Sequence, residues 1–205
     1  MWLSSVQVRG FKSFAERFEL SFSQGITGMV GPAGWGRTNL IEAIRWALGE
    51  PSLTVLRASE PRDLIFAGTD KRRDVFQATV SLVFSDCPED WGLVDNKLRV
   101  TRQINDRTGT DLLTGQNGRL DAQTVAQLLE RAGLDPQKLV FDHNTFSPLP
   151  CDCPLNILDL RKLAESSVTE EHLERYRHDR QLIVLTDDKR IMPLCDNISG
   201  ITMEE

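Results

Sequence analysis

The sequence predicts a single α/β domain in which a core sheet flanked by helices is joined to an antiparallel β lobe at its N-terminal side. A short apolar strand at 26–30 runs through a glycine-rich turn into a helical pattern at 39–48. Two alternating segments, 76–84 and 97–104, are typical of a half-exposed antiparallel sheet. A compact apolar segment at 181–186 fits a buried strand. These patterns together predict the fold class.

The length and composition restrict the class of protein. A chain of 205 residues with 40% hydrophobic residues is within the size that one core supports. No apolar run approaches the roughly 20 residues that cross a bilayer. Residues 1–9 alternate like a strand and lack the apolar segment of a signal peptide. We therefore expect a cytoplasmic protein with no membrane partner.

The charge of the chain argues against a strongly basic nucleic-acid binder. The formal net charge is −6, which opposes non-specific attraction to a phosphate polymer. Basic residues cluster at 71–73 and around Arg99, Arg102 and Arg107, but these clusters are short and lack interleaved aromatic residues. A solvated surface is the favoured interpretation of each cluster, so composition alone does not predict DNA binding.

The N-terminal elements are predicted from alternation and from glycine boundaries. Strands are expected at 3–9, 18–22 and 26–30, and glycines bracket the third strand. The helix at 39–48 is expected to end at Gly49, because a glycine followed closely by a proline commonly terminates a helix.

The later elements are predicted from turn and capping residues. Residues 111–118 are predicted to form a hairpin whose turn is the Asn117-Gly118 pair. Asp121 is the predicted N-cap of a helix at 122–131 that ends near Gly133. The remaining predictions are an irregular, proline-rich segment at 141–154, strands at 155–160, 181–186 and 198–203, and a helix from Ser167 to about His178.

The four cysteines do not form the framework of a secreted disulfide protein at this length. Cys151 and Cys153, with Asp142 and His143 nearby, offer metal-ligating atoms. A single C-x-C beside prolines lacks the paired spacing of a zinc site, so reduced thiols in a loop are the favoured interpretation.

The segment Gly31–Thr38, with the sequence G-P-A-G-W-G-R-T, is the main candidate for chemistry. It fits the phosphate-loop pattern G-x-x-x-x-G-K-[ST] except that Arg37 replaces the lysine. Backbone N–H groups and the helix N-terminus in such a loop hold a di- or triphosphate, and Thr38 would offer its hydroxyl to Mg²⁺. The alternative is a glycine turn without a ligand. The nucleotide-binding candidates in and after the loop are Gly31, Ala33, Gly34, Trp35, Gly36, Arg37, Thr38 and Asn39.

Two residues of this loop depart from the usual pattern. Arg37 keeps the positive charge, but its planar guanidinium is not equivalent to a compact ammonium at a close phosphate site. Trp35 places a large ring in a loop of small residues, where it is expected either to crowd the turn or to stack on a neighbour. Both departures predict weakened binding of ATP or ADP with Mg²⁺.

Several long strings of the chain match one family. In them the chain resembles the ATPase head of the SMC (structural maintenance of chromosomes) proteins, of the bacterial chromosome-condensing type. The resemblance covers about residues 1–141 and 155–205 and implies an ABC-type P-loop fold. The strings are 10–15, 25–27, 30–32, Asn39, 43–46, 48–50, 56–57, 64–68, 186–189 and 200–205.

The resemblance also implies roles for individual residues. The family's Walker B strand ends in Asp-Glu, where the aspartate holds Mg²⁺ through water and the glutamate activates the attacking water. Asp159 matches the first position, whereas Leu160 occupies the second and has no group that accepts a proton. Losing a general base costs about 10²- to 10⁴-fold in rate. Arg57 matches an arginine that reaches phosphate in the family, and Asp187 replaces the family's switch histidine.

The interval between the two matching halves is short. The family's glutamine of the Q-loop aligns with His143 or Asn144, and its coiled-coil arms, hinge and L-S-G-G-E signature follow before the Walker B strand. The stretch from Asn144 to Leu155 contains none of these elements. We expect residues 1–205 to form one head-like domain, with 1–141 as its N-terminal half, 142–154 as a connector and 155–205 as its C-terminal half.

These observations predict an SMC-like head that binds ATP or ADP weakly, hydrolyses little or none, and acts as a binding module linked to chromosome maintenance. Family analogy suggests a true SMC head, SMC accessory subunits or DNA as partners. Two alternatives stay open: a slow or partner-completed ATPase, and a folded remnant without nucleotide binding.

Overall fold

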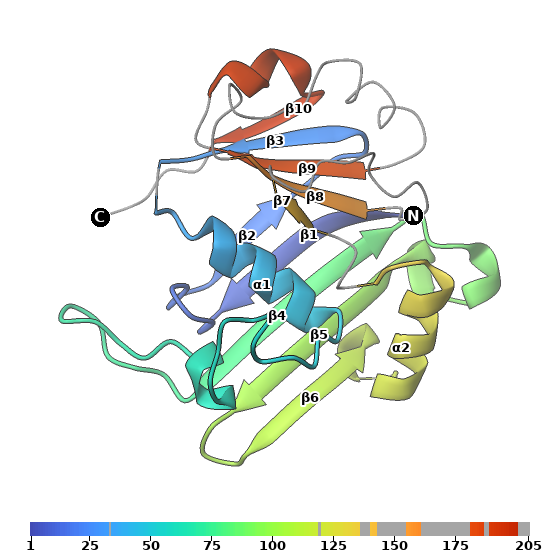
Figure 1. The fold of residues 1–205 in the computed structure, drawn as a ribbon. Helices are drawn as coiled ribbons and strands as arrows, with labels where there is room; N and C mark the ends of the chain where they lie inside the picture. Colours follow the sequence, from blue (N-terminus) through green and yellow to red (C-terminus); the bar gives the residue numbers. More distant parts are fainter. Residues whose placement is uncertain are drawn as a thin grey trace.

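A computed structural model describes residues 1–32, 34–118, 120–135, 140–142, 155–160, 181–186 and 189–200. Two sheets lie one above the other, and helix α1 (Arg37–Ala47) lies between them (Figure 1). Each sheet contains five strands among the described residues. One sheet is antiparallel and the other is parallel, which confirms the predicted α/β class with an antiparallel lobe.

The antiparallel sheet is built from the predicted alternating segments. Its strands are β1 (Trp2–Arg9), β2 (Phe18–Ser21), β4 (Gln77–Ser85), β5 (Leu98–Asn105) and β6 (Thr110–Gly115), in the order β2-β1-β4-β5-β6. One face of the three inner strands, β1, β4 and β5, is buried because apolar residues alternate with polar ones. The buried apolar residues of this inner face include Leu3, Val6, Val8, Ala78, Val80, Leu82, Phe84, Leu98, Val100 and Ile104.

The parallel sheet combines strands from both ends of the chain. It consists of β3 (Ile26–Val30), β7 (Val140–Asp142), β8 (Leu155–Leu160), β9 (Gln181–Thr186) and β10 (Asn197–Gly200), in the order β10-β3-β9-β8-β7. All six residues of β9 are buried, as expected for a central parallel strand covered on both faces. The early strand β3 therefore lies between two strands from the end of the chain.

The two helices form where the sequence predicted them. Helix α1 buries residues around most of its circumference because a sheet lies on each side of it. Helix α2 (Ala122–Arg131) packs beside β6, and its N-cap is Asp121, whose Oδ1 accepts the Thr124 N–H at 2.8 Å. Short 3₁₀ turns occur at Pro61–Leu64, Glu89–Trp91, Val94–Asn96, Gln116–Gly118 and Lys189–Leu194.

Arg102 of β5 fixes the C-terminal end of α1 to the antiparallel sheet. Its Nη1 donates to the carbonyl oxygens of Trp46 and Glu50 at 2.8 and 3.1 Å. Its Nε and Nη2 donate to the two carboxylate oxygens of Asp111 at 2.9 and 2.8 Å. The guanidinium carbon lies 5.0 Å from the centre of the Trp46 ring. The Trp46 carbonyl also accepts the Gly49 N–H at 3.0 Å, so Arg102 adds a second donor there. A positive group at the C-terminus of a helix is stabilised by the negative end of the helix dipole.

Gln181 joins the two sheets. Its side chain is at the start of β9, and its Nε2 donates to the carbonyl oxygens of Leu3 and Ser23 at 2.8 and 3.1 Å. Its Oε1 accepts the Leu3 N–H at 2.8 Å. These bonds occur where the β1–β4 register shifts between Leu3 and Ser5. The buried amide of Gln181 thus bonds both the N–H and the carbonyl group of Leu3, next to the irregularity in the β1–β4 ladder.

The hairpin predicted at 111–118 is present only in part. Strand β6 forms its hairpin with β5, and residues 106–109 make the connection. The Asn117-Gly118 pair lies in a 3₁₀ turn that is closed by a single antiparallel bridge between Gly115 and Leu120. The Asn-Gly signal identified a turn correctly, since Gly118 has φ 88°, but did not identify which strands pair.

Some predictions fall on residues that the structure does not describe: the helix near 167–178, the end of the strand predicted at 198–203, and most of the connector.

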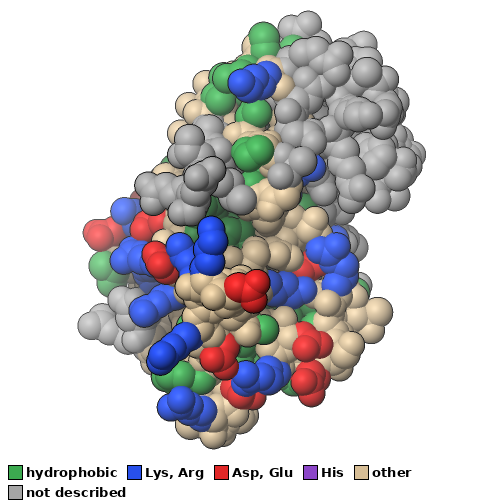
Figure 2. Space-filling model, turned by 90° about the vertical axis from the view of Figure 1, so that its left-hand side faces the viewer, with side chains coloured by type: hydrophobic (Ala, Val, Ile, Leu, Met, Phe, Trp, Pro, Cys, Tyr) green, Lys and Arg blue, Asp and Glu red, His purple; other side chains and the backbone are tan. Residues whose placement is uncertain are grey.

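Figure 2 shows Lys and Arg side chains interspersed with Asp and Glu over the antiparallel lobe, in agreement with a solvated surface. Within the described residues, no helix has both the length and the apolar character that a membrane span requires.

Candidate functional site

The predicted strand–loop–helix is present. Strand β3 ends at Val30, and the loop leads directly into the first residue of α1, Arg37. The Gly31 N–H donates to the Thr186 carbonyl at 3.2 Å, so the loop starts beside the end of the neighbouring strand β9. Gly36 is the N-cap with φ 96°, a left-handed conformation that glycine adopts without steric cost. Because glycine has no side chain, no side-chain cap covers this helix end.

Asp159 lies at the same edge of the sheet as the loop. In the register of the parallel sheet, Val30 pairs with Thr186, and Thr186 pairs with Leu160. Asp159 is therefore one residue before the level at which β3 enters the loop, with only β9 between the two strands. Ligands of open parallel sheets bind at the carboxyl ends of the strands. Asp142 of β7 pairs with Asp159, so a second acidic residue lies at this edge, and the sequence analysis did not assign it to the nucleotide site.

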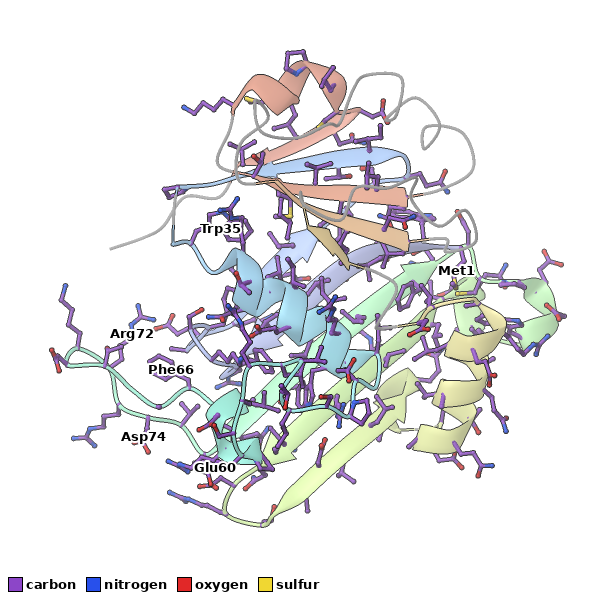
Figure 3. The ribbon with its side chains drawn as sticks, viewed as in Figure 1. Met1, Trp35, Glu60, Phe66, Arg72 and Asp74 are labelled. Atoms are coloured by element: carbon purple, nitrogen blue, oxygen red, sulfur yellow. The ribbon has the colours of Figure 1, made fainter. Side chains whose placement is uncertain are left out.

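The side chain of Trp35 lies inside the protein. It is 4% exposed and lies between the start of α1 and the parallel sheet (Figure 3). A Cβ on Gly31 would lie 2.5 Å from Cδ1 of the indole, so the ring packs directly on the backbone of its own loop. The Trp35 N–H bonds to the Pro32 carbonyl at 3.3 Å. The ring thus packs against its own loop inside the protein, which leaves the backbone of Trp35 as its candidate for ligand contact.

The segment before β2, residues 10–17, covers the start of α1. Asn39 Nδ2 donates to Ser13 Oγ at 2.8 Å. A Cβ on Gly36 would approach Phe14 Cζ at 3.1 Å and Ser13 Oγ at 3.2 Å, so the segment lies tightly against this glycine. By contrast, a Cβ on Gly34 would have no atom of the described residues within 4 Å, and its φ is 88°. The loop is thus closed on the side of Ser13 and open at Gly34, which fits an approaching phosphate.

Arg57 pairs with a buried carboxylate beside α1. Glu42 is 3% exposed, and its carboxylate accepts Lys12 Nζ at 2.6 Å and also accepts Arg57 Nε. Lys12 Nζ additionally donates to the Leu56 carbonyl. Lys12 and Arg57 have φ values of 47° and 48°, so both cations are presented from left-handed backbone positions. The Arg57 side chain is 58% exposed, which leaves part of its guanidinium accessible from solvent.

The structure separates the predicted site residues into groups. The loop glycines and the positions of Arg37, Thr38 and Asn39 lie together at the N-terminus of α1. Arg57 is beside that helix through Glu42, and Asp159 is at the end of β8. Ala33, His143, Asn144, Cys151, Cys153 and Asp187 lie outside the described residues.

Sequence reasoning missed Lys12, Ser13 and Glu42 as neighbours of the loop. Lys12 and Ser13 were noted only as part of the string 10–15, and nothing local indicated that this string lies over α1. The one available signal was Glu42, a charged residue on a helix face that otherwise reads as apolar. Among the described residues, no cluster of three or more His, Cys, Asp and Glu side chains could hold a metal ion by itself.

Most of the chain matches a known protein family. The model of the RecF/RecN/SMC N-terminal domain matches residues 2–140. The chromosome partition protein Smc of Fusobacterium nucleatum is 35% identical over 130 residues, which are 63% of this chain and 10% of that protein. The Smc of Bacillus subtilis is 41% identical over 104 residues, which are 51% of this chain and 9% of that protein. The chain thus spans about a tenth of the length of these relatives.

Several solved SMC head structures have a fold similar to that of this chain. The Smc head bound to the C-terminal winged-helix domain of ScpA has a TM-score of 0.82 at 17% identity, covering 100% of this chain and 95% of that chain. The SMC head domain from Thermotoga maritima has a TM-score of 0.72 at 21% identity, covering 100% and 96%. The Smc head from Pyrococcus furiosus, bound to the C-terminal domain of ScpA, has a TM-score of 0.62 at 26% identity, covering 72% and 39%.

Proposed function

This chain belongs to the RecF/RecN/SMC N-terminal domain family and has an SMC head-type fold, and on that premise we propose that its loop at Gly31–Thr38 binds ATP or ADP weakly with Mg²⁺ and supports little or no hydrolysis. The chain acts as a binding or regulatory module linked to chromosome maintenance. Residues 142–154 join the two halves of its head. The observation that carries the proposal is the uncapped N-terminus of α1 behind a glycine loop that is open at Gly34.

The local chemistry supports nucleotide binding. A helix N-terminus with glycines in left-handed conformations presents backbone N–H groups to an anion. Gly31, Ala33, Gly34, Trp35 and Gly36 would contribute backbone atoms. The side chains of Arg37, Thr38, Asn39 and Arg57 would approach phosphate, and Thr38 and Asp159 would hold Mg²⁺. The bound ion would offset charge on the phosphates.

The same residues support weak binding. Arg37 offers a longer, planar cation where the loop pattern has a lysine, so it cannot reproduce the short ammonium contact. Asn39 already bonds to Ser13, and Arg57 already pairs with Glu42. Any contact of these two side chains with a nucleotide therefore competes with an existing partner.

Hydrolysis is disfavoured by one position. Leu160 follows Asp159 at the end of β8, where the family has its general base, and a leucine side chain cannot accept a proton from water. Binding without turnover is the consequence that we propose.

The candidate partners are a true SMC head, an SMC accessory subunit or DNA. Two of the similar solved heads are bound to C-terminal domains of ScpA, which favours an accessory subunit of that type. The net charge of −6 makes a direct, non-specific attachment to DNA the least favoured of the three.

Calorimetric titration of the full chain with ATP and ADP, with and without Mg²⁺, tests the proposal. We expect a dissociation constant weaker than about 10 μM. Arg37→Lys should tighten binding, and Thr38→Ala should remove its dependence on Mg²⁺. Thr54→Ala is the matched control because Thr54 is exposed and outside the loop. Identical titrations for the unaltered chain and the three variants would contradict the proposal. If none of the four proteins gives a heat of binding, the proposal is wrong and the chain is a folded remnant without nucleotide binding.

The slow or partner-completed ATPase is the second candidate, because the loop and Asp159 share one sheet edge. Phosphate release by the purified chain separates it from the first. Mg²⁺-dependent turnover that Thr38→Ala abolishes would replace our proposal. If binding occurs without turnover, Leu160→Glu supplies the missing base, and turnover should then rise, by about 10²-fold if geometry allows.

A further inference from the structure

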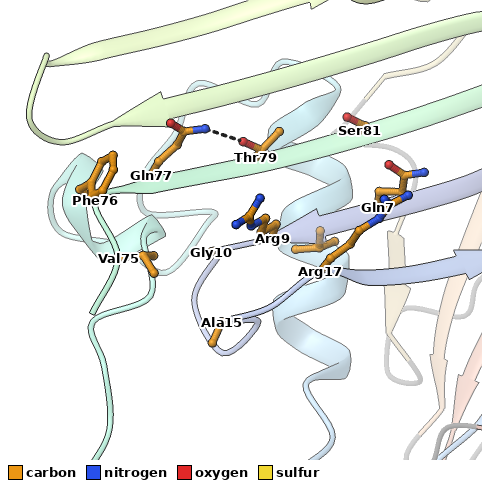
Figure 4. A pocket seen from close by; sticks show the side chains of 11 residues that line it. Gln7, Arg9, Gly10, Ala15, Arg17, Val75, Phe76, Gln77, Thr79 and Ser81 are labelled. Carbon is orange, nitrogen blue, oxygen red and sulfur yellow. Dashed lines mark hydrogen bonds between the residues drawn. The ribbon is translucent and has the colours of Figure 1, made fainter. Parts of the chain in front are cut away.

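The outer face of the antiparallel sheet carries a second candidate binding site, whose lining contains no residue of the loop at Gly31–Thr38. A pocket of about 450 Å³ lies where β1, β4 and the segment before β2 meet. Its residues alternate with the buried ones of the same strands, so it opens away from α1 (Figure 4). Six of its side chains carry the argument: Gln7, Arg9, Arg17, Phe76, Thr79 and Ser81.

The pocket is positively charged in an acidic protein. Its lining contains two arginines and no carboxylate, whereas the whole chain has a net charge of −6. Arg17 pairs with Glu19 at 2.8 Å. Arg9 forms no ion pair with any described residue, so its guanidinium has its full donor capacity available. A planar guanidinium with free donors matches the oxygens of a phosphate group.

Neutral donors surround the arginines. Thr79 lies across from Arg9 in the β1–β4 register, and Ser81 lies across from Gln7. Figure 4 shows Arg9 and Thr79 on adjacent strands within the pocket. The Thr79 hydroxyl accepts a bond from Gln77 Nε2 at 3.3 Å, so its own proton is available to an incoming acceptor. Hydroxyl and amide donors beside a free arginine suit a tetrahedral anion with several oxygens.

The other end of the pocket is apolar. Val75 and Phe76 line it, and the Phe76 side chain is 44% exposed. The guanidinium carbon of Arg107 lies 4.2 Å from the centre of the Phe76 ring, which holds that ring in place. An aromatic surface next to a phosphate-binding arginine accommodates a base or another flat organic group.

We propose that this pocket binds the phosphate group of an organic phosphate, with the phosphate on Arg9 and the organic part against Phe76. The source of the phosphate is either a free small molecule or a nucleotide unit of single-stranded nucleic acid, since both present the same group. The site does not depend on the loop at Gly31–Thr38 and stands whether or not that loop binds nucleotide.

NMR titration of the full chain tests the proposal, with inorganic phosphate and a short oligothymidine as separate probes. Arg9 side-chain and Thr79 amide signals should shift with at least one probe. Arg9→Gln should weaken that binding about fivefold. Arg99→Gln is the matched control, because Arg99 projects from the same sheet face but does not line this pocket. Thr38→Ala, which alters the loop, should leave both titrations unchanged.

The outcomes separate the sources. If only inorganic phosphate binds, the site is assigned to a small organic phosphate. If oligothymidine binds, is displaced by phosphate and binds more weakly to the Phe76→Leu variant, the site is assigned to single-stranded nucleic acid. Equal weakening by Arg9→Gln and Arg99→Gln would show a diffuse charge effect and overturn the proposal. The absence of any shift at Arg9 with both probes would overturn it as well. Arg9 is exposed and Arg99 is half-buried, and unchanged melting temperatures verify that the variants fold.

Discussion

Replacement of Gln181 by leucine should lower the free energy of unfolding, because it removes the hydrogen bonds between the two sheets and leaves the contacts within each sheet in place. The Gln181 side chain is 2% exposed and makes three hydrogen bonds, at 2.8, 2.8 and 3.1 Å, to backbone groups of Leu3 and Ser23. Leucine has a similar volume but neither donates nor accepts. The substitution therefore leaves one buried N–H and two carbonyl groups without this partner.

The magnitude follows from these three bonds. Each net hydrogen bond contributes about 1 kcal/mol, and an unsatisfied buried partner adds to the loss, whereas the burial of a wholly apolar side chain offsets part of it. We expect the free energy of unfolding to fall by about 3 kcal/mol. Urea denaturation followed by tryptophan fluorescence measures this, since the chain has four tryptophans.

A matched control is available on β1. Gln7 Nε2 donates to Glu19 Oε1 at 2.9 Å on the exposed face of the sheet. Gln7→Leu should change the free energy of unfolding by less than about 0.5 kcal/mol. If Gln181→Leu costs less than about 1 kcal/mol, or no more than Gln7→Leu, the idea that one amide joins the sheets is wrong.

Three further predictions concern the core, the helix end and pH. Trp35→Ala should lower the free energy of unfolding by about 3 kcal/mol, because it empties the space beneath the loop; calorimetric melting checks this, and an unchanged melting temperature would contradict the burial of the indole. Arg102→Leu should cost about 2 kcal/mol, because the carbonyls of Trp46 and Glu50 lose this donor; Arg99→Leu, on the outer face of the same strand, is the control and should cost much less. The pKa of the Asp121 carboxyl is lowered by the backbone N–H of Thr124, so its stabilising effect is present above its unfolded pKa and is lost as pH falls through the folded one. Asp121→Asn keeps a cap that does not titrate, so its unfolding curves should lose that acid-dependent part, and an unchanged pH profile would exclude the cap as its origin.

The local patterns determined most individual elements. The alternation in residues 76–84 and 97–104 predicted β4 and β5, because one face of each strand packs on α1 while the other meets solvent. The loop motif and the cap at Asp121 were readable for the same reason: each is defined by residues adjacent in sequence, and short-range hydrogen bonds fix their conformation.

Features that depend on residues far apart in the sequence were determined only by the tertiary structure. The Asn117-Gly118 signal could not show that β6 pairs with β5 through residues 106–109, because strand pairing depends on which faces bury each other. Trp35 was readable as an anomaly, but only the packing against Gly31 shows that the ring faces the interior. The Lys12–Glu42–Arg57 group was invisible for a similar reason, since its members are far apart in sequence and meet only when α1 is covered from both sides.

The sequence by itself thus determined the glycine-rich loop at Gly31–Thr38 and its flanking strand and helix. The tertiary structure alone decided that Asp159 shares the loop's edge of the sheet, that Gln181 holds the two sheets together and that Arg9 is left without an ion-pair partner among the described residues. The physical reason is that backbone conformation responds to neighbouring residues, whereas burial and charge pairing depend on segments that only folding brings into contact.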